Sequence, residues 1–346
     1  MIAKRIAALT PYVAGEQPAG GYIKLNTNEN PYPPSPSVAE ALRVFDTEKL
    51  RLYPDPDSKA LTAEIAAYEG VRAENIFLGN GSDEVLAFGF CALFEKQVAF
   101  ADVTYSFYPV YCDLYGFKKI ILPLNPDFTV DSSAYKKTAC GGIVIANPNA
   151  PVSLSMDEQE IIQLAKSVSC NVLIDEAYID FARNTKSLAS VAPQFKNLLI
   201  VKTFSKSYSL AGLRCGYAVG NAELIEGLNR VKNCFNSYTL GALCQTAALA
   251  AVRDRAYFNQ TVQKILSTRQ HTADALQKAG HTVITSDANF LFVRHSSVSG
   301  AEAYARLKQQ NILVRHFAAP RTAAYIRVTV GTDAEMDAFT NAFLKF

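Results

Sequence analysis

The chain has 346 residues, of which 49% are hydrophobic and 19% are charged, and its formal net charge is +2. This length suits one large and one small domain, and the composition is that of a well-buried globular protein. The nearly neutral charge argues against nucleic acid or an anionic membrane as a partner, and the chain shows neither an apolar leader nor a bilayer-length apolar stretch, so we expect a cytoplasmic protein.

The first fifty residues are rich in proline and show little periodicity, which predicts an irregular arm over residues 1–45. From about residue 60, short runs of Val, Ile and Leu alternate with helical patterns, as expected for strands covered on both faces. This order predicts an α/β domain over residues 46–240 with a doubly wound, mostly parallel sheet. The strands expected there are 76–78, 98–103, 120–122, 142–146, 172–174, 198–201 and 216–219, with helices at 82–94 and 157–168.

The pattern changes near residue 240. Residues 241–278 form one long, alanine-rich helical stretch with few breaks. Strands at 283–284 and 290–293, a helix at 301–310, strands at 312–314 and 326–328, and a closing helix are expected after it. These elements predict a small α+β domain over residues 241–346, to which the arm contributes.

The strongest chemical signal is Lys206, which follows an expected strand in the sequence Thr-Phe-Ser-Lys-Ser. A lysine at a strand end can form a Schiff base with a carbonyl when burial and a cationic neighbour keep its amine partly neutral. The nearby hydroxyls of Thr203 and Ser205 and the guanidinium of Arg214 suit a phosphate. A solvated lysine is the alternative.

Acidic and aromatic residues follow other expected strands. Asp175 ends an apolar run, where open α/β sheets bind ligands, and its carboxylate could pair with a protonated pyridine nitrogen. Tyr178 could bond the phenolic oxygen of the same ring, and Tyr105 could stack on its face. A metal-binding aspartate or a helix cap is the alternative for Asp175, although the chain has no G-x-x-x-x-G-K-[ST] motif.

Two loops at strand ends add further candidates. Gly81, Ser82 and Asp83 begin an expected helix whose N-terminus favours an anion, with a simple helix cap as the alternative. Asn149 lies in a proline-rich turn that could present amides to a ligand or serve the fold alone.

Three arginines, Arg315, Arg321 and Arg327, crowd the last expected strands. An arginine within an apolar strand is costly to bury unless it meets an anion, which favours an oxyanion site. A structural ion pair is equally compatible with the pattern.

Disulfides and metal ions are not expected. The seven cysteines are scattered, odd in number and never in C-x-x-C spacing, which indicates buried, reduced thiols. The four histidines show no H-E-x-x-H pattern.

Taken together, these motifs resemble those of the fold-type-I aminotransferases and, within them, the histidinol-phosphate aminotransferase family. The resemblance runs nearly end to end. It includes Asn-Glu-Asn-Pro at 28–31, Tyr-Pro-Asp-Pro at 53–56, Gly-Ser-Asp at 81–83, Asp-Glu-Ala-Tyr at 175–178, Thr-Phe-Ser-Lys at 203–206, Ala-Gly-Leu-Arg-Cys-Gly at 211–216 and Arg-Val-Thr-Val-Gly at 327–331.

The resemblance implies a pyridoxal 5'-phosphate cofactor linked to Lys206, with Asp175 at its pyridine nitrogen. Tyr53 would reach the cofactor phosphate of a neighbouring subunit, which implies a homodimer. The other residues implied to bind the cofactor are Tyr178, Tyr105, Gly81, Ser82, Asp83, Thr203, Ser205 and Arg214. The residues implied to contact the substrate are Tyr12, Asn30, Arg315 and Arg327.

One turn departs from the family pattern. The usual Pro-Asn-Asn-Pro-Thr-Gly is Pro-Asn-Ala-Pro-Val-Ser at 148–153, so Ala150 stands where the superfamily has an asparagine that bonds the ring oxygen. Either Asn149 replaces that contact from one position earlier, or Tyr178 makes it alone.

The implied reaction is a ping-pong amino transfer of histidine biosynthesis, from L-histidinol phosphate to 2-oxoglutarate, giving imidazole-acetol phosphate and L-glutamate. An aromatic amino-acid aminotransferase or a threonine-phosphate decarboxylase would share the same cofactor residues. A non-catalytic, aminotransferase-like sensor domain is more distant, because such domains carry an appended DNA-binding module. A nicotinamide dehydrogenase is disfavoured, because the chain has no G-x-G-x-x-G motif.

Overall fold

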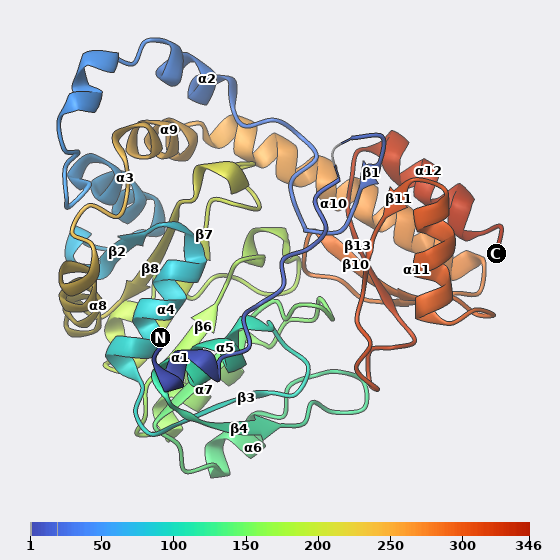
Figure 1. Ribbon diagram of the computed structural model, residues 1–346, viewed down its shortest axis with the longest axis horizontal. Coiled ribbons are helices and arrows are strands. Elements are labelled where there is room, and N and C mark those ends of the chain that lie inside the picture. Colours follow the sequence, from blue (N-terminus) through green and yellow to red (C-terminus); the bar gives the residue numbers. More distant parts are fainter. Residues whose placement is uncertain (1, 19) are drawn as a thin grey trace.

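The computed structural model describes residues 2–18 and 20–346 (Figure 1). In this part of the chain the larger sheet has seven strands in the order β2–β8–β7–β6–β5–β3–β4. Neighbouring strands are parallel except where β8 pairs with β2 and with β7, which confirms the expected α/β class and mostly parallel sheet. The strands are β2 (Ile76–Gly79), β3 (Gln97–Ala101), β4 (Lys118–Leu122), β5 (Gly142–Ala146), β6 (Val172–Asp175), β7 (Leu198–Thr203) and β8 (Gly216–Gly220).

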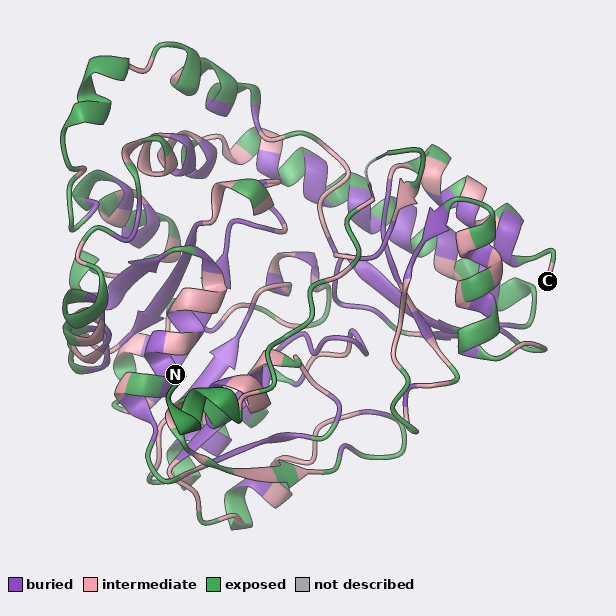
Figure 2. Cartoon of the chain, in the orientation of Figure 1, coloured by how far each residue is buried: buried purple, intermediate pink, exposed green. Residues whose placement is uncertain are grey.

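Helices cover both faces of this sheet, which explains why its strands are apolar without alternation. All residues of β5, β6 and β7 are buried, and Figure 2 shows the central strands enclosed by helices. One face packs against α4 (Gly81–Leu93), α5 (Phe107–Tyr115) and α8 (Ala222–Phe235). The other face packs against α6 (Ser132–Lys137) and α7 (Glu158–Ser167), and toward β2 against α3 (Lys59–Glu69) and α9 (Ala242–Arg253).

A smaller, antiparallel sheet of β12–β13–β10–β9 lies beside the C-terminal helices. Its strands are β9 (Thr282–Ile284), β10 (Phe290–Arg294), β12 (Arg315–His316) and β13 (Ile326–Thr329), with α10 (Arg255–Lys278), α11 (Gly300–Gln309) and α12 (Asp333–Phe343) packed around them. From the arm, β1 (Ile23–Lys24) pairs in parallel with β11 (Ile312–Leu313). The α+β character expected of this region is therefore present, while the division at residues 45 and 240 stays a prediction.

The helical stretch expected over 241–278 is present with one break, at Asp254, which separates α9 from α10. Asp254 has φ −87° and ψ 68°, and its side chain accepts a hydrogen bond from the backbone N–H of Tyr257. An aspartate in this position caps the second helix. The break lets α9 pack on the large sheet's helices while α10 reaches the small sheet.

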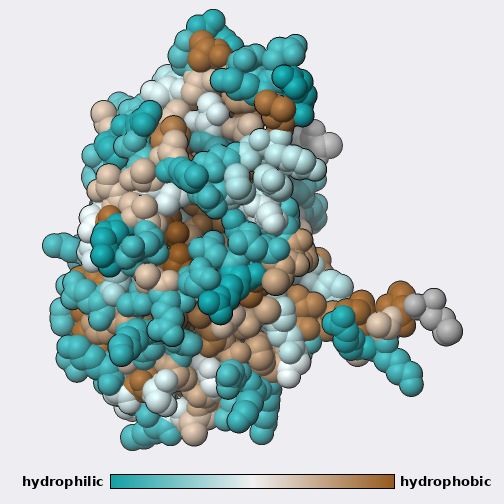
Figure 3. Space-filling view, turned by 90° about the vertical axis from the view of Figure 1, so that its left-hand side faces the viewer, coloured by the Kyte–Doolittle hydropathy of each residue, from teal (hydrophilic) through white to brown (hydrophobic). Residues whose placement is uncertain are grey.

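The arm is more regular than expected, because it contains α1 (Lys4–Ala7) and α2 (Pro36–Arg43). The segment around α1 projects from the body of the molecule (Figure 3). Within the described residues, no helix combines the length and the apolar character needed to cross a membrane.

Candidate active site

A cavity of about 200 Å³ opens where β5, β6 and β7 end, between the large sheet, the arm and the strands β12 and β13. Carboxyl ends of parallel strands meet at one edge of a sheet, which explains why motifs far apart in the sequence converge here. The predicted residues that line the cavity are Tyr12, Ser82, Asp83, Tyr105, Asp175, Tyr178, Ser205, Lys206, Arg214, Arg315 and Arg327. The predicted residues outside its lining are Gly81, Thr203, Asn149, Asn30 and Tyr53.

Lys206 reaches the cavity from the turn after β7. Its Nζ lies 3.3 Å from the carbonyl oxygen of Thr27 and 5.7 Å from the ring centre of Tyr178. Within residues 2–18 and 20–346, no carboxylate lies within ion-pair distance of this amine. The amine is therefore held by a weak partner and stays free for a ligand.

Asn30 has a structural role that the sequence did not indicate. Its side-chain amide donates to the backbone carbonyls of Lys206, at 3.0 Å, and of Ser207, at 3.3 Å. Its own side-chain oxygen accepts from the backbone N–H of Tyr32. Asn30 therefore fixes the backbone that carries Lys206 from outside the cavity lining, and its contact with a substrate stays a prediction.

Asp175 is buried at the end of β6. The hydroxyl of Tyr108 donates to its Oδ2 at 3.0 Å, and the backbone N–H of Ala177 donates to its Oδ1 at 3.1 Å. Burial raises the pKa of Asp175 to about 6, and the hydrogen bonds from Tyr108 and Ala177 oppose that rise. Such a carboxylate would gain much from a protonated nitrogen placed against it.

The phenol of Tyr178 is oriented by a residue that the sequence motifs did not single out. The side-chain amide of Asn28 donates to Tyr178 Oη at 3.0 Å. Asn28 has φ 56°, and this conformation is held by its backbone N–H donating to Thr329 Oγ1 and by its carbonyl accepting from Asn289. A signal was present, because Asn28 opens the Asn-Glu-Asn-Pro run.

Arg214 and the N-terminus of α4 lie together at one wall of the cavity. A Cβ atom at Gly81 would come within 2.5 Å of Arg214 Nη2, and one at Gly216 would come within 2.5 Å of the Ser82 nitrogen. These two glycines thus allow the guanidinium and the helix N-terminus to lie against each other. Arg214 Nη2 lies 3.1 Å from Asp83 Oδ2. The arrangement of a helix N-terminus, hydroxyls and a guanidinium suits a phosphate.

The hydroxyls around Arg214 have distinct roles. Ser205 Oγ accepts a hydrogen bond from Arg214 Nη1 at 3.5 Å and lines the cavity. Thr203 Oγ1 accepts from the backbone N–H of Ser205 at 3.1 Å and so shapes the turn from outside the lining. Tyr105 donates to Asp83 Oδ1 at 2.9 Å, which places its ring at the cavity wall.

The three C-terminal arginines separate into two classes. Arg327 is half-buried on β13 and donates from Nη2 to the carbonyl oxygen of Asn26 at 2.8 Å, while its buried Nε has no partner among the described residues. Burial lowers its pKa, and repulsion from Arg315 contributes. Arg321 instead pairs with Asp102 at 2.7 Å, outside the cavity. Arg315 and Arg327 therefore both line the cavity, where they could hold an anion, whereas Arg321 makes an ion pair outside it.

The turn that departs from the family pattern places Ala150, and not Asn149, at the cavity. The side-chain amide of Asn149 donates to the carbonyl oxygen of Val103 at 2.8 Å, and its buried Oδ1 has no partner in the part of the chain that the structure covers. The idea that Asn149 replaces the missing asparagine is thus not supported by its position. Tyr178 remains as the phenol placed to meet a ring oxygen.

Two further tyrosines lie at the margins. Tyr12 lines the cavity and stacks on Phe107 with ring centres 4.3 Å apart. Tyr53 lies away from the cavity, is 81% exposed and stacks on Tyr238 at 4.5 Å.

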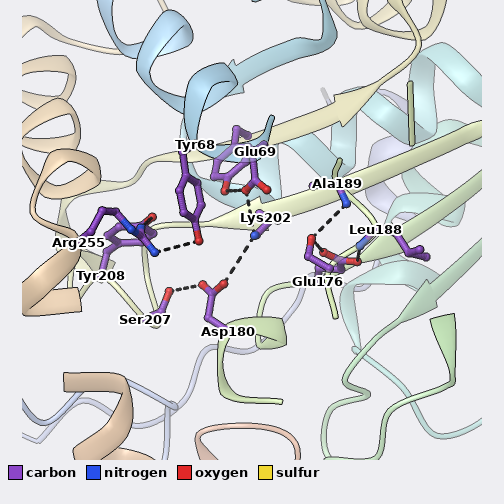
Figure 4. Close-up of polar contacts among 12 residues, drawn as sticks. Tyr68, Glu69, Glu176, Asp180, Leu188, Ala189, Lys202, Ser207, Tyr208 and Arg255 are labelled. Atoms are coloured by element: carbon purple, nitrogen blue, oxygen red, sulfur yellow. Dashed lines mark hydrogen bonds and ion pairs between the residues drawn. The ribbon is translucent and has the colours of Figure 1, made fainter. Parts of the chain in front are cut away.

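A buried ionic network lies behind the Lys206 turn (Figure 4). Lys202 on β7 pairs with Glu69 at 3.0 Å and with Asp180 at 3.6 Å, and Asp180 accepts a 2.6 Å hydrogen bond from the hydroxyl of Ser207. Burial also raises the pKa of the nearby Glu176 to about 7. Sequence reasoning missed this network, although a lysine inside an apolar strand was a visible signal.

Residues 21–343 match the family model of class I and II aminotransferases. The chain is 50% identical to histidinol-phosphate aminotransferase 2 of Thiobacillus denitrificans, over 97% of this chain and 95% of that protein. It is 45% identical to histidinol-phosphate aminotransferase of Brachyspira hyodysenteriae, over 98% and 96%. The crystal structure of histidinol-phosphate aminotransferase from Sinorhizobium meliloti in complex with pyridoxal-5'-phosphate shares the fold, with a TM-score of 0.88, 23% identity and coverage of 99% and 96%.

Proposed function

Because the chain belongs to the histidinol-phosphate aminotransferases within the class I and II aminotransferases, we propose that its cavity transfers the amino group of L-histidinol phosphate to 2-oxoglutarate. The products are imidazole-acetol phosphate and L-glutamate. The observation that carries this proposal is the meeting of Lys206, Asp175 and two arginines in one cavity.

The cavity fits pyridoxal 5'-phosphate, the cofactor of this family. Lys206 offers an amine without a carboxylate partner among the described residues, and Asp175 offers a buried carboxylate for the ring nitrogen. Ser82, Ser205 and Arg214 offer donors for the phosphate. When bound, the cofactor supplies an electron sink for the negative charge left on the substrate carbon after a proton is removed.

The chain's own residues would divide the remaining work. Lys206 Nζ is the base that removes the proton from the substrate carbon and returns it. Tyr178 Oη, held by Asn28, orients the ring oxygen. Arg315 and Arg327 bind the phosphate of one substrate and a carboxylate of the other, since a guanidinium accepts both anions in the same bidentate manner. One site can therefore serve both half-reactions.

A homodimer is part of the proposal. Large apolar side chains are exposed on the segment that follows α2 and at the end of α8: Val44 62%, Leu50 53%, Leu52 55%, Tyr53 81% and Phe235 77%. Tyr53 stacks on Tyr238, which follows α8, so the two segments meet, and a large exposed apolar patch is typical of an interface. A partner subunit would cover it, and Tyr53 would then reach the neighbouring cofactor phosphate. The cytoplasmic location likewise remains a proposal.

Replacement of Lys206 by Ala tests the function. Turnover of imidazole-acetol phosphate with glutamate should disappear, together with the visible absorption that the cofactor gives on the wild-type protein, whereas the exposed Lys196→Ala should keep both. Near-normal turnover in Lys206→Ala would refute the assignment. If the protein turns over phenylpyruvate faster than imidazole-acetol phosphate, the proposed substrate is wrong and the enzyme is an aromatic amino-acid aminotransferase. If it releases carbon dioxide from threonine phosphate, it is a threonine-phosphate decarboxylase.

A further inference from the structure

Two cysteines lie together at the edge of the large sheet opposite the cavity. Cys140 precedes β5 and Cys170 precedes β6, and these parallel neighbours pair with Ile143 opposite Val172. The two loops therefore meet at the amino ends of the strands, and the Sγ atoms lie 3.6 Å apart. Both side chains are half-buried, whereas the sequence predicted buried thiols.

Hydrogen bonds hold the backbone on both sides of this pair. The side-chain amide of Asn197 donates to the carbonyl oxygen of Cys170 at 3.1 Å. The side-chain amide of Gln97 donates to the carbonyl oxygen of Ala139 at 2.7 Å. A disulfide has an S–S distance of about 2.0 Å, so the sulfurs would need to approach by roughly 1.5 Å, which rotation of the side chains can supply.

The pair is also accessible and chemically primed. A cavity of about 350 Å³ borders both cysteines, together with Lys136, Ser167 and Ser169, so a small oxidant can reach the sulfurs. The thiol of Cys170 beside it lowers the pKa of Cys140, which favours the reactive thiolate. Elsewhere in the chain, Cys112 and Cys215 are buried.

We propose that Cys140 and Cys170 form a redox-active thiol pair that a peroxide oxidises to an intramolecular disulfide. The Cys140 thiolate attacks the peroxide, the O–O bond breaks, and Cys140 becomes a sulfenic acid while the leaving hydroxide takes up a proton to give one water. Cys170 then displaces the hydroxyl from Cys140, which forms the S–S bond and a second water. The two sulfurs lose two electrons, and hydrogen peroxide is reduced to two waters.

Peptide mapping of the whole protein tests the proposal. After brief treatment with hydrogen peroxide and alkylation, trypsin should release peptides 138–166 and 167–183 joined by a disulfide, and dithiothreitol should separate them. The free-thiol count, measured after denaturation, should fall by two from the seven of the reduced protein. The linked peptides require no variant, so a folding defect cannot obscure the result.

Two variants sharpen the test. Cys140→Ser and Cys170→Ser should each abolish the fall of two thiols, whereas replacement of the exposed Cys234 by Ser should leave it intact. The proposal is overturned if peroxide leaves peptides 138–166 and 167–183 unlinked. It is equally overturned if the lost thiols map to Cys91, Cys234 or the contact of Cys215 with Cys244.

Discussion

The hydroxyl of Ser207 donates a 2.6 Å hydrogen bond to Asp180, and this bond ties the residue after Lys206 to the ionic network beneath the sheet edge. Asn30 holds the same backbone from the arm side. The backbone around Lys206 is therefore held from two sides, by Asn30 and by Asp180. The position of the Lys206 side chain in the cavity depends on both contacts.

Replacement of Ser207 by Ala should destabilise the protein by about 1.5–3 kcal/mol, because the lost bond ends on a charged carboxylate. Urea unfolding followed by circular dichroism measures this change. Ser297→Ala, at an exposed position, is the matched control and should change stability by less than about 0.5 kcal/mol. Equal free energies of unfolding for Ser207→Ala and Ser297→Ala would show that the hydrogen bond to Asp180 does not stabilise the fold.

Lys202→Met should be more damaging than Ser207→Ala. Removal of the buried ammonium leaves Glu69 and Asp180 without their cation, and breaking a buried ion pair destabilises by about 3–5 kcal/mol. Lys59→Met removes an exposed pair with Asp57 and should change the free energy of unfolding by less than about 1 kcal/mol. Thermal or urea unfolding of both variants measures the difference. Similar losses of unfolding free energy in Lys202→Met and Lys59→Met would show that the buried ion pairs of Lys202 contribute no more than an exposed pair.

Asp175→Asn should change how the stability of the cofactor-free protein depends on pH. Burial raises the pKa of Asp175 from 3.8 to about 6, so the folded state binds the proton more tightly than the unfolded state. Stability therefore falls as pH rises from about 4 to above 6, by a total on the order of 3 kcal/mol, and the lost stability does not return at higher pH.

The Asn variant should lose this part of the slope and be more stable than the wild type at pH 7, although it should be inactive. A residual slope of the same sign should persist, because burial raises the pKa of Glu176 to about 7. Urea unfolding at a series of pH values measures both effects. A wild-type stability that rises steadily over this pH range would contradict the expected sign.

Arg327→Met should weaken binding of anionic substrates and leave the fold intact. Loss of a charged hydrogen-bond donor should raise KM for imidazole-acetol phosphate by about tenfold to a hundredfold, with a smaller change in kcat. Arg321→Met is the matched control: it removes the pair with Asp102 and should leave KM unchanged. Steady-state kinetics on both variants gives the comparison, and an unchanged KM in Arg327→Met would remove this residue from the anion site.

The strands of the large sheet were predictable because burial on both faces leaves a continuous apolar run. The expected strand at 142–146 coincides with β5, whose residues are all buried. The break at Asp254 was not predictable from periodicity, because the helical pattern continues on both sides of it. Only the backbone geometry of that one residue separates α9 from α10.

The cavity was largely predictable because its motifs stand at strand ends, and parallel pairing brings those ends together. Contacts between distant segments could not be paired from the sequence, even where one partner stood in a recognised motif. Tyr108 meets Asp175 across 67 positions, and Asn28 meets Tyr178 across 150. The resemblance assigned a role to Asn30 and none to Asn28, and only the fold shows that Asn28 faces the cavity and Asn30 the backbone of Lys206.

The bond between the backbone N–H of Asn28 and the hydroxyl of Thr329 joins positions 301 residues apart. A ribosome makes Asn28 early and Thr329 almost last, so this bond forms only when translation is nearly complete. The vitamin-derived group therefore meets a finished pocket only around the time of chain release. Truncated products that lack the final strand and helix would keep the arm's contacts with Lys206 and β11 but lose this bond and Arg327, so we expect them to carry an incomplete pocket.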